Sequence, residues 1–165
     1  MIPLLRYFLF IWIFINILFV SLSFYRVRNS GKKVGWIWWW AGILGAFVWE
    51  DLLVFSFYNI IAANLVLVLD DFRYAVVLTL VFWVVRSLGE ALYNFLQQFN
   101  QPTMYPHNQF LWDDLKIFKK VFGNISNQKV FFILQITMQI TTVFSLFFLI
   151  YTFLHWEAIG NIVNI

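Results

Sequence analysis

Residues 74–95 read YAVVLTLVFWVVRSLGEALYNF, a long and mostly apolar run. A membrane-spanning helix needs about 20 mostly apolar residues, and the stretch is long enough to cross a bilayer once. It also carries Arg86 and Glu90 among its apolar residues. The sequence therefore predicts a spanning helix that holds charged side chains inside the membrane.

Three further apolar runs accompany it, at about residues 5–24, 36–63 and 130–154. The 165-residue chain is 62% hydrophobic and only 12% charged, whereas a soluble domain is about 45–50% apolar and about 25% charged. We therefore predict one transmembrane domain, residues 1–165. Its fold is an all-α integral membrane four-helix bundle whose main partner is the lipid bilayer.

The first run has a second interpretation, because Ser21 and Ser23 resemble the small residues of a signal-peptidase site. The basic residues that follow, Arg26, Arg28, Lys32 and Lys33, oppose translocation of that segment. They favour an uncleaved anchor over a cleaved signal peptide.

Between the third and fourth runs, residues 109–122 have the pattern of an amphipathic helix. Apolar residues recur at helical spacing, and Asp and Lys occupy the other faces; the apolar set is Leu111, Leu115, Phe118 and Phe122. This pattern predicts a helix lying in the membrane interface. A soluble helix packed on the bundle is the alternative.

Basic residues predict the orientation of the bundle, because cytoplasmic loops are enriched in Lys and Arg. The first and third loops hold Arg26, Arg28, Lys32, Lys33, Lys116, Lys119, Lys120 and Lys129. The opposite side holds Arg6 and Arg73. We expect both loops in the cytoplasm and both termini on the non-cytoplasmic side. The short loops are typical of a cell inner (plasma) membrane protein.

Four charged residues interrupt the second and third runs: Glu50, Asp51, Arg86 and Glu90. A charge at the bilayer centre costs roughly 2.5–3.5 kcal/mol on insertion scales, so it normally faces the bundle interior and has a partner. With a turn at residues 64–71, Arg86 lies at nearly the depth of Glu50 and Asp51 on the neighbouring antiparallel helix. We predict a salt bridge from Arg86 to one of those two carboxylates, with Glu90 holding the guanidinium from one turn away.

The acidic pair also allows a different second helix, broken into residues 36–49 and 52–63. Broken helices near the midplane are a feature of transporters. Neither proline nor glycine stands at the junction, which favours the continuous helix.

Polar residues recur at helical spacing in the other runs as well. The sets are Thr79, Trp83, Arg86, Glu90, Asn94 and Gln97 in the third run, Gln135, Gln139 and Thr142 in the fourth, and Asn16 and Ser23 in the first. In a membrane such side chains are expected to turn inward and to form hydrogen bonds across helices.

The chain has no cysteine, and it contains no Walker loop, HExxH, GxSxG or GxGxxG motif. His107 and His155 lie far apart in the sequence, and the acidic pairs Asp70-Asp71 and Asp113-Asp114 lack supporting ligands. We therefore predict no catalytic, cofactor-binding or metal-binding residues, no enzyme activity and no nucleic-acid partner.

Two function classes follow from the charges inside the membrane. One is a structural or assembly subunit held together by an ion pair, either in a homo-oligomer or with a membrane partner subunit. The other is a small proton, cation or solute transporter or channel component that uses Glu50, Asp51, Arg86 and Glu90. If these four groups meet and all are ionised, they carry a net charge of −2, which favours protonation, hydration or a bound cation.

Overall fold

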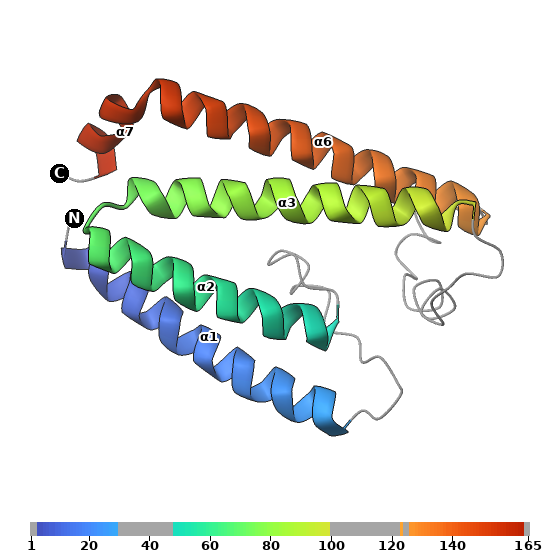
Figure 1. The fold of residues 1–165 in the computed structure, drawn as a ribbon, viewed down its shortest axis with the longest axis horizontal. Helices are drawn as coiled ribbons and strands as arrows, with labels where there is room; N and C mark the ends of the chain where they lie inside the picture. The colour runs from blue at the N-terminus through green and yellow to red at the C-terminus, as the bar shows by residue number, and fades with distance from the viewer. Residues whose placement is uncertain (1–2, 30–47, 100–122, 124–125, 164–165) are drawn as a thin grey trace. The chain divides into compact units, whose positions relative to one another are not determined.

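The computed structural model describes residues 3–29, 48–99, 123 and 126–163, and these residues are almost entirely helical. The helices are α1 (Pro3–Asn29), α2 (Trp49–Leu69), α3 (Arg73–Gln97), α6 (Asn127–Leu154) and α7 (Trp156–Val163), as Figure 1 shows. The all-α prediction is confirmed. The interfacial helix predicted at residues 109–122 lies outside the described residues.

Four of these helices, α1, α2, α3 and α6, are long and apolar enough to cross a membrane. The shortest of them, α2, has 21 residues. At a rise of 1.5 Å per residue it is about 32 Å long, which matches a hydrocarbon core of about 30 Å. Within the described part of the chain, the number of helices able to span a membrane therefore equals the predicted four.

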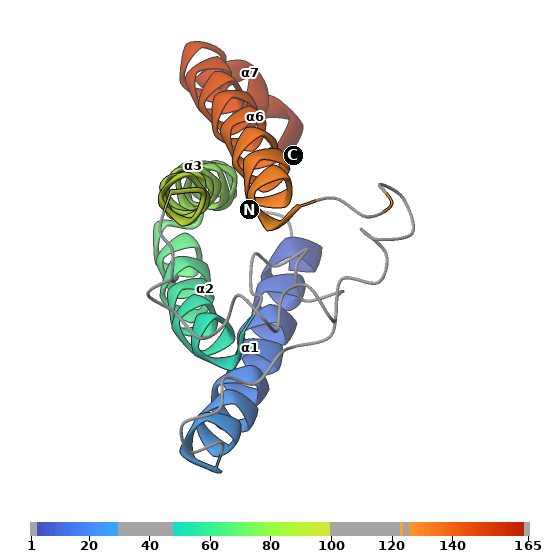
Figure 2. The same cartoon turned by 90° about the vertical axis from the view of Figure 1, so that its right-hand side faces the viewer.

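The chain divides into two compact units, residues 1–81 with 148–165 and residues 82–147, and the boundaries fall within α3 and α6. In the first unit, α1 and α2 lie side by side and run in opposite directions (Figures 1 and 2). The Arg6 guanidinium meets Asp70 at one end of the pair, 2.6 Å away. At the other end the Arg26 guanidinium lies 5.7 Å from the centre of the Trp49 ring.

The fully buried positions of α1 and α2 include several small or polar residues at heptad spacing. The buried positions are Leu9, Asn16 and Ser23 on α1, each seven residues apart, and Leu52, Ser56, Ala63 and Val66 on α2. Small side chains let helix backbones approach closely in a membrane, where apolar burial alone does not drive association. The inward orientation predicted for Asn16 and Ser23 is confirmed.

The turn between α2 and α3 is shorter and later than the predicted residues 64–71. The α2 helix continues through Asn64, whose side-chain amide donates to the Ile60 carbonyl at 2.8 Å, and ends at Leu69. Asp70 then adopts a left-handed conformation, with φ 53° and ψ 30°. Asp71 caps α3 by accepting a hydrogen bond from the Arg73 backbone N–H at 3.0 Å. An asparagine that bonds to its own helix therefore does not act as a turn residue here.

Candidate functional site

Arg86 and Glu90 form an ion pair within α3, one helical turn apart. Arg86 stands near the middle of this 25-residue helix. The Arg86 side chain is 17% exposed and the Glu90 side chain 19%. The predicted contact of Glu90 with the guanidinium is confirmed. As an ionised pair the two groups carry no net charge, which lowers the cost of placing either of them inside a membrane.

Glu50 and Asp51 stand in the first turn of α2, which begins at Trp49. The Glu50 side chain is exposed and Asp51 is partly buried. Carboxylates are stabilised in this position, because unpaired backbone N–H groups and the helix dipole place positive partial charge at a helix N-terminus. Since α2 is long enough to cross by itself, the acidic pair marks the end of the helix and not its centre.

The corrected turn also changes the depth expected for Arg86. The observed turn centres on residue 71, so Arg86 is expected at the depth of position 56, which lies equally far before the turn. The predicted turn had instead placed position 85 at the depth of Glu50. The two ends of the predicted salt bridge lie in different compact units. The salt bridge from Arg86 to Glu50 or Asp51 therefore stays a prediction.

In the second unit, one side-chain hydrogen bond joins α6 to α3, and another joins α6 to Gln98, the residue that follows α3. The Ser87 and Thr142 hydroxyl oxygens lie 2.8 Å apart, and the Gln98 amide donates to the Gln135 side-chain oxygen at 2.6 Å. Ser87 is also fully buried. These bonds confirm the predicted inward orientation for Gln135 and Thr142.

Gln139 does not follow this pattern, although it belongs to the same predicted polar set. Its side chain is exposed, and its carboxamide forms no hydrogen bond with any residue that the structure describes. Gln139 lies close to the centre of α6. The predicted inward orientation is therefore wrong for this residue.

A second polar cluster, centred on Arg73, lies at the turn between α2 and α3. The Arg73 guanidinium donates to both carboxylate oxygens of Asp71, with the shortest contact at 2.7 Å. It also donates to the Trp156 backbone carbonyl at 3.1 Å and lies 4.5 Å from the centre of the Trp156 ring. Glu157 stands 4.0 Å from the same guanidinium. This cluster attaches the short helix α7 to the start of α3.

No pattern in the sequence predicted this cluster. Arg73 and Trp156 are separated by 83 residues, and no spacing rule joins them. The only available signal was the placement of both at the same predicted membrane surface. Asp70, next in the turn, accepts a hydrogen bond from Arg6, and this bond lowers the pKa of the Asp70 carboxyl.

Both carboxylates of the Asp70-Asp71 pair are therefore engaged by arginines, which fits a structural role and not a magnesium site. Among the described residues, no group of three His, Asp or Glu side chains could hold a metal ion. His155 is exposed, and its ring stacks on Tyr151 with 4.1 Å between centroids. His107, Asp113 and Asp114 lie outside the described residues.

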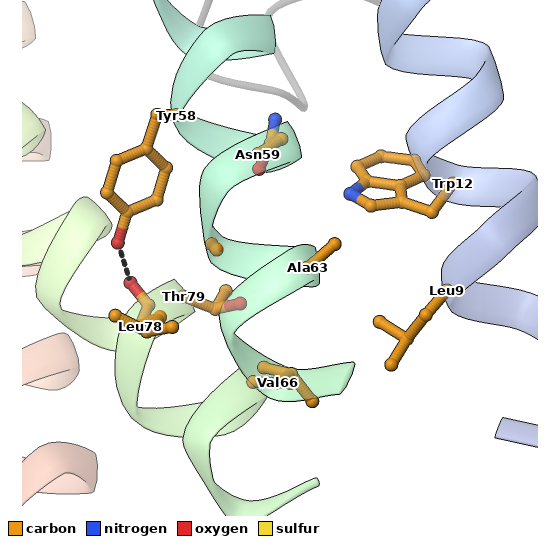
Figure 3. Close-up of a pocket in the computed structure, with 10 residues that line it drawn as sticks. Leu9, Trp12, Tyr58, Asn59, Ala63, Val66, Leu78 and Thr79 are labelled. Carbon is orange, nitrogen blue, oxygen red and sulfur yellow. Dashed lines mark hydrogen bonds between the residues drawn. The ribbon is translucent and has the colours of Figure 1, made fainter. Parts of the chain in front are cut away.

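A pocket of about 60 Å³ lies between α1, α2 and the first turns of α3. Figure 3 shows Leu9 and Trp12 of α1 across from Asn59 and Ala63 of α2. The Tyr58 hydroxyl closes one side by donating to the Leu78 carbonyl at 2.7 Å. The volume corresponds to about two water molecules, far below the roughly 300–1,000 Å³ of sites for drug-sized ligands. This pocket has no room for an organic substrate.

Comparison with known proteins returned no match: the chain fits no protein-family model and resembles no curated protein or solved structure.

Proposed function

We propose that this chain is a multi-pass integral membrane protein that serves as a structural or assembly subunit and is not an enzyme. The observation that carries the proposal is the ion pair between Arg86 and Glu90. An arginine that meets a carboxylate on its own helix is neutralised before it contacts any substrate. A group that moves protons or ions must instead change its charge or its partner during the cycle.

The bonds that attach α6 to α3 and to the residue after it support the same function. Ser87 meets Thr142 directly, at 2.8 Å, and Gln98 meets Gln135 at 2.6 Å. Side chains in direct contact leave no space for a substrate between them. Such bonds hold membrane helices together, each contributing about 0.6–2 kcal/mol.

For the location we propose the inner (plasma) membrane of the cell, with both termini on the non-cytoplasmic side. The support is the concentration of Lys and Arg in the first and third loops. Reporters fused after Asn29 and after Ile165 test this orientation. A cytoplasmic signal at the first site and a non-cytoplasmic signal at the second are expected; the reverse pair of signals would contradict the orientation.

Transport is the second candidate function, and the observation that favours it is the exposed side chain of Glu50 in the first turn of α2. Together with Asp51 it places two carboxylates at one end of a membrane-length helix. In a small proton, cation or solute transporter these groups would form the entrance of the pathway.

Flux measurements in liposomes distinguish the two functions. The purified protein is compared with a variant carrying Glu50→Gln and Asp51→Asn and with a control carrying Glu157→Gln, which removes a carboxylate that is 91% exposed. For a structural subunit we expect no proton or monovalent-cation flux from any of the three. Flux that is present in the original protein and in the control, but lost in the Glu50 and Asp51 variant, would show that the protein is a transporter and not an assembly subunit.

A further inference from the structure

Exposed residues on α6 recur at alternating steps of four and three. They are Phe132, Ile136, Gln139, Val143, Leu146 and Ile150, which we call the Gln139 stripe. Steps of four and three are the spacing of the contact positions in a left-handed pair of helices, because they keep one face turned toward the partner. Exposed apolar residues alone are ordinary on a membrane helix, since lipid covers them.

Gln139 makes this face different from the rest of the exposed surface of α6. Of its neighbours on the helix, Thr142 bonds to Ser87 of α3 and Gln135 bonds to Gln98, the residue that follows α3. The Gln139 carboxamide has no such bond within the described part of the chain. The residue lies near the middle of a 28-residue helix, where lipid offers neither a donor nor an acceptor. An amide in that position is stabilised by a partner of matching chemistry.

The chemistry of the amide specifies the partner. A carboxamide both donates and accepts hydrogen bonds, so it is complementary to itself. Two copies of a membrane protein share one orientation, and a two-fold axis along the membrane normal brings identical helices together in parallel. On that axis Gln139 meets the same residue of the second copy. A single polar residue in an otherwise apolar contact stripe is also how coiled coils fix their register and their number of strands.

We propose that the Gln139 stripe is the contact surface of a parallel homodimer, in which two α6 helices pair and the two Gln139 carboxamides bond to each other. The proposal rests on the assembly function and names its partner, a second copy of this chain. The apolar residues of the stripe supply the packing, and Gln139 selects the register.

Disulfide cross-linking tests the surface directly, because the chain has no cysteine of its own. Ile136→Cys and Val143→Cys place a single thiol on the stripe. Thr137→Cys and Phe144→Cys are matched controls: both residues are exposed, and each follows a stripe residue by one position, so it lies at nearly the same depth and about 100° farther round the helix. Mild oxidation in native membranes is expected to produce cross-linked dimers from the two stripe variants and not from the two controls.

Energy transfer between labelled copies in liposomes tests the role of the amide. Gln139→Leu keeps the approximate size of the side chain and removes its hydrogen bonds. It is expected to raise the dimer dissociation constant about 5-fold to 30-fold. Gln139→Asn keeps the carboxamide and should retain most of the association.

Several results would overturn the proposal. Equal cross-linking of stripe and control variants would indicate random collision, and cross-linking of the controls alone would place the interface on another face. A dissociation constant unchanged by Gln139→Leu would remove the amide from the interface. A stable complex with a different membrane protein, with no cross-link at the stripe, would overturn the homodimer and leave the assembly function standing.

Discussion

The Arg73 guanidinium stands over the indole ring of Trp156, so that a residue at the start of α3 holds the start of α7. The edge of the Tyr74 ring also meets the Trp156 ring, with 5.5 Å between centroids. Three kinds of contact therefore converge on one tryptophan: a cation over the ring face, a hydrogen bond to the backbone carbonyl and an aromatic edge.

Gly160→Ala is expected to loosen α7. A Cβ at Gly160 would stand 2.6 Å from an Arg73 side-chain nitrogen, so the guanidinium must shift away from Trp156. Hydrogen exchange of the α7 backbone should accelerate. Gly89→Ala is the matched control, because a Cβ at Gly89 meets nothing within 4 Å. Equal exchange rates in the original protein and in the Gly160 variant would show that Arg73 does not hold α7.

Asp70 should make stability depend on pH in the acid range. Arg6 lowers the pKa of this carboxyl in the folded protein below the unfolded value of about 3.9. Its contribution is therefore fully present above about pH 4 and is lost as the pH falls through the lower folded pKa. Asp70→Asn should remove that part of the acid dependence, measured as unfolding temperature in detergent against pH. Because both side chains are about half exposed, high salt should weaken the effect. An unchanged pH profile in the Asp70 variant would contradict the role of the pair.

Two buried serines should respond oppositely to alanine. The Ser56 hydroxyl is buried without a hydrogen-bond partner among the described residues, so Ser56→Ala should leave the free energy of unfolding unchanged or raise it by about 1 kcal/mol. The Ser87 hydroxyl bonds to Thr142, so Ser87→Ala should lower it by about 0.6–2 kcal/mol. Unfolding in mixed micelles measures both. Equal losses from the two variants would mean that Ser56 has a hydrogen-bond partner in the membrane.

The Arg86 and Glu90 pair should tolerate joint removal better than the loss of one member. Arg86→Leu leaves Glu90 partly buried without its cation and is expected to cost about 3–5 kcal/mol of stability. The double variant, with Glu90→Leu added, should recover most of that loss. Arg28→Leu, at an exposed position near the end of α1, serves as a control for the general effect of losing one arginine. A double variant no more stable than Arg86→Leu alone would show that the arginine acts through another partner.

The sequence predicted the helices because each span is a long apolar run, and length and composition suffice for that conclusion. It also located Arg86 and Glu90 on one face, since a spacing of four residues fixes neighbours on any helix. It placed the turn too early because Asn64 favours turns in water, whereas its amide here bonds to the preceding helical turn.

The remaining differences concern contacts between distant segments. Gln135, Gln139 and Thr142 lie within about 60° of one another around α6. Periodicity alone could not show that Gln135 and Thr142 lie inside the contact with the neighbouring helix while Gln139 lies outside it. The cluster of Arg73, Asp71 and Trp156 depends on α7 folding back toward α3. No local sequence pattern predicts this contact, because whether two segments 83 residues apart meet depends on how all the residues between them fold.

The short turn from Asp70 to Phe72 has a consequence for biogenesis. For a chain that crosses the membrane as proposed, three residues cannot reach back across the bilayer, so α2 cannot be released into lipid before α3 has entered. The two helices must partition from the translocation machinery as one hairpin, with the turn leading. Asp70 and Asp71 then cross first, and each forms an ion pair on the far side. Asp70 pairs with Arg6 of α1, the helix already inserted, and Asp71 pairs with Arg73 of α3, the helix that follows.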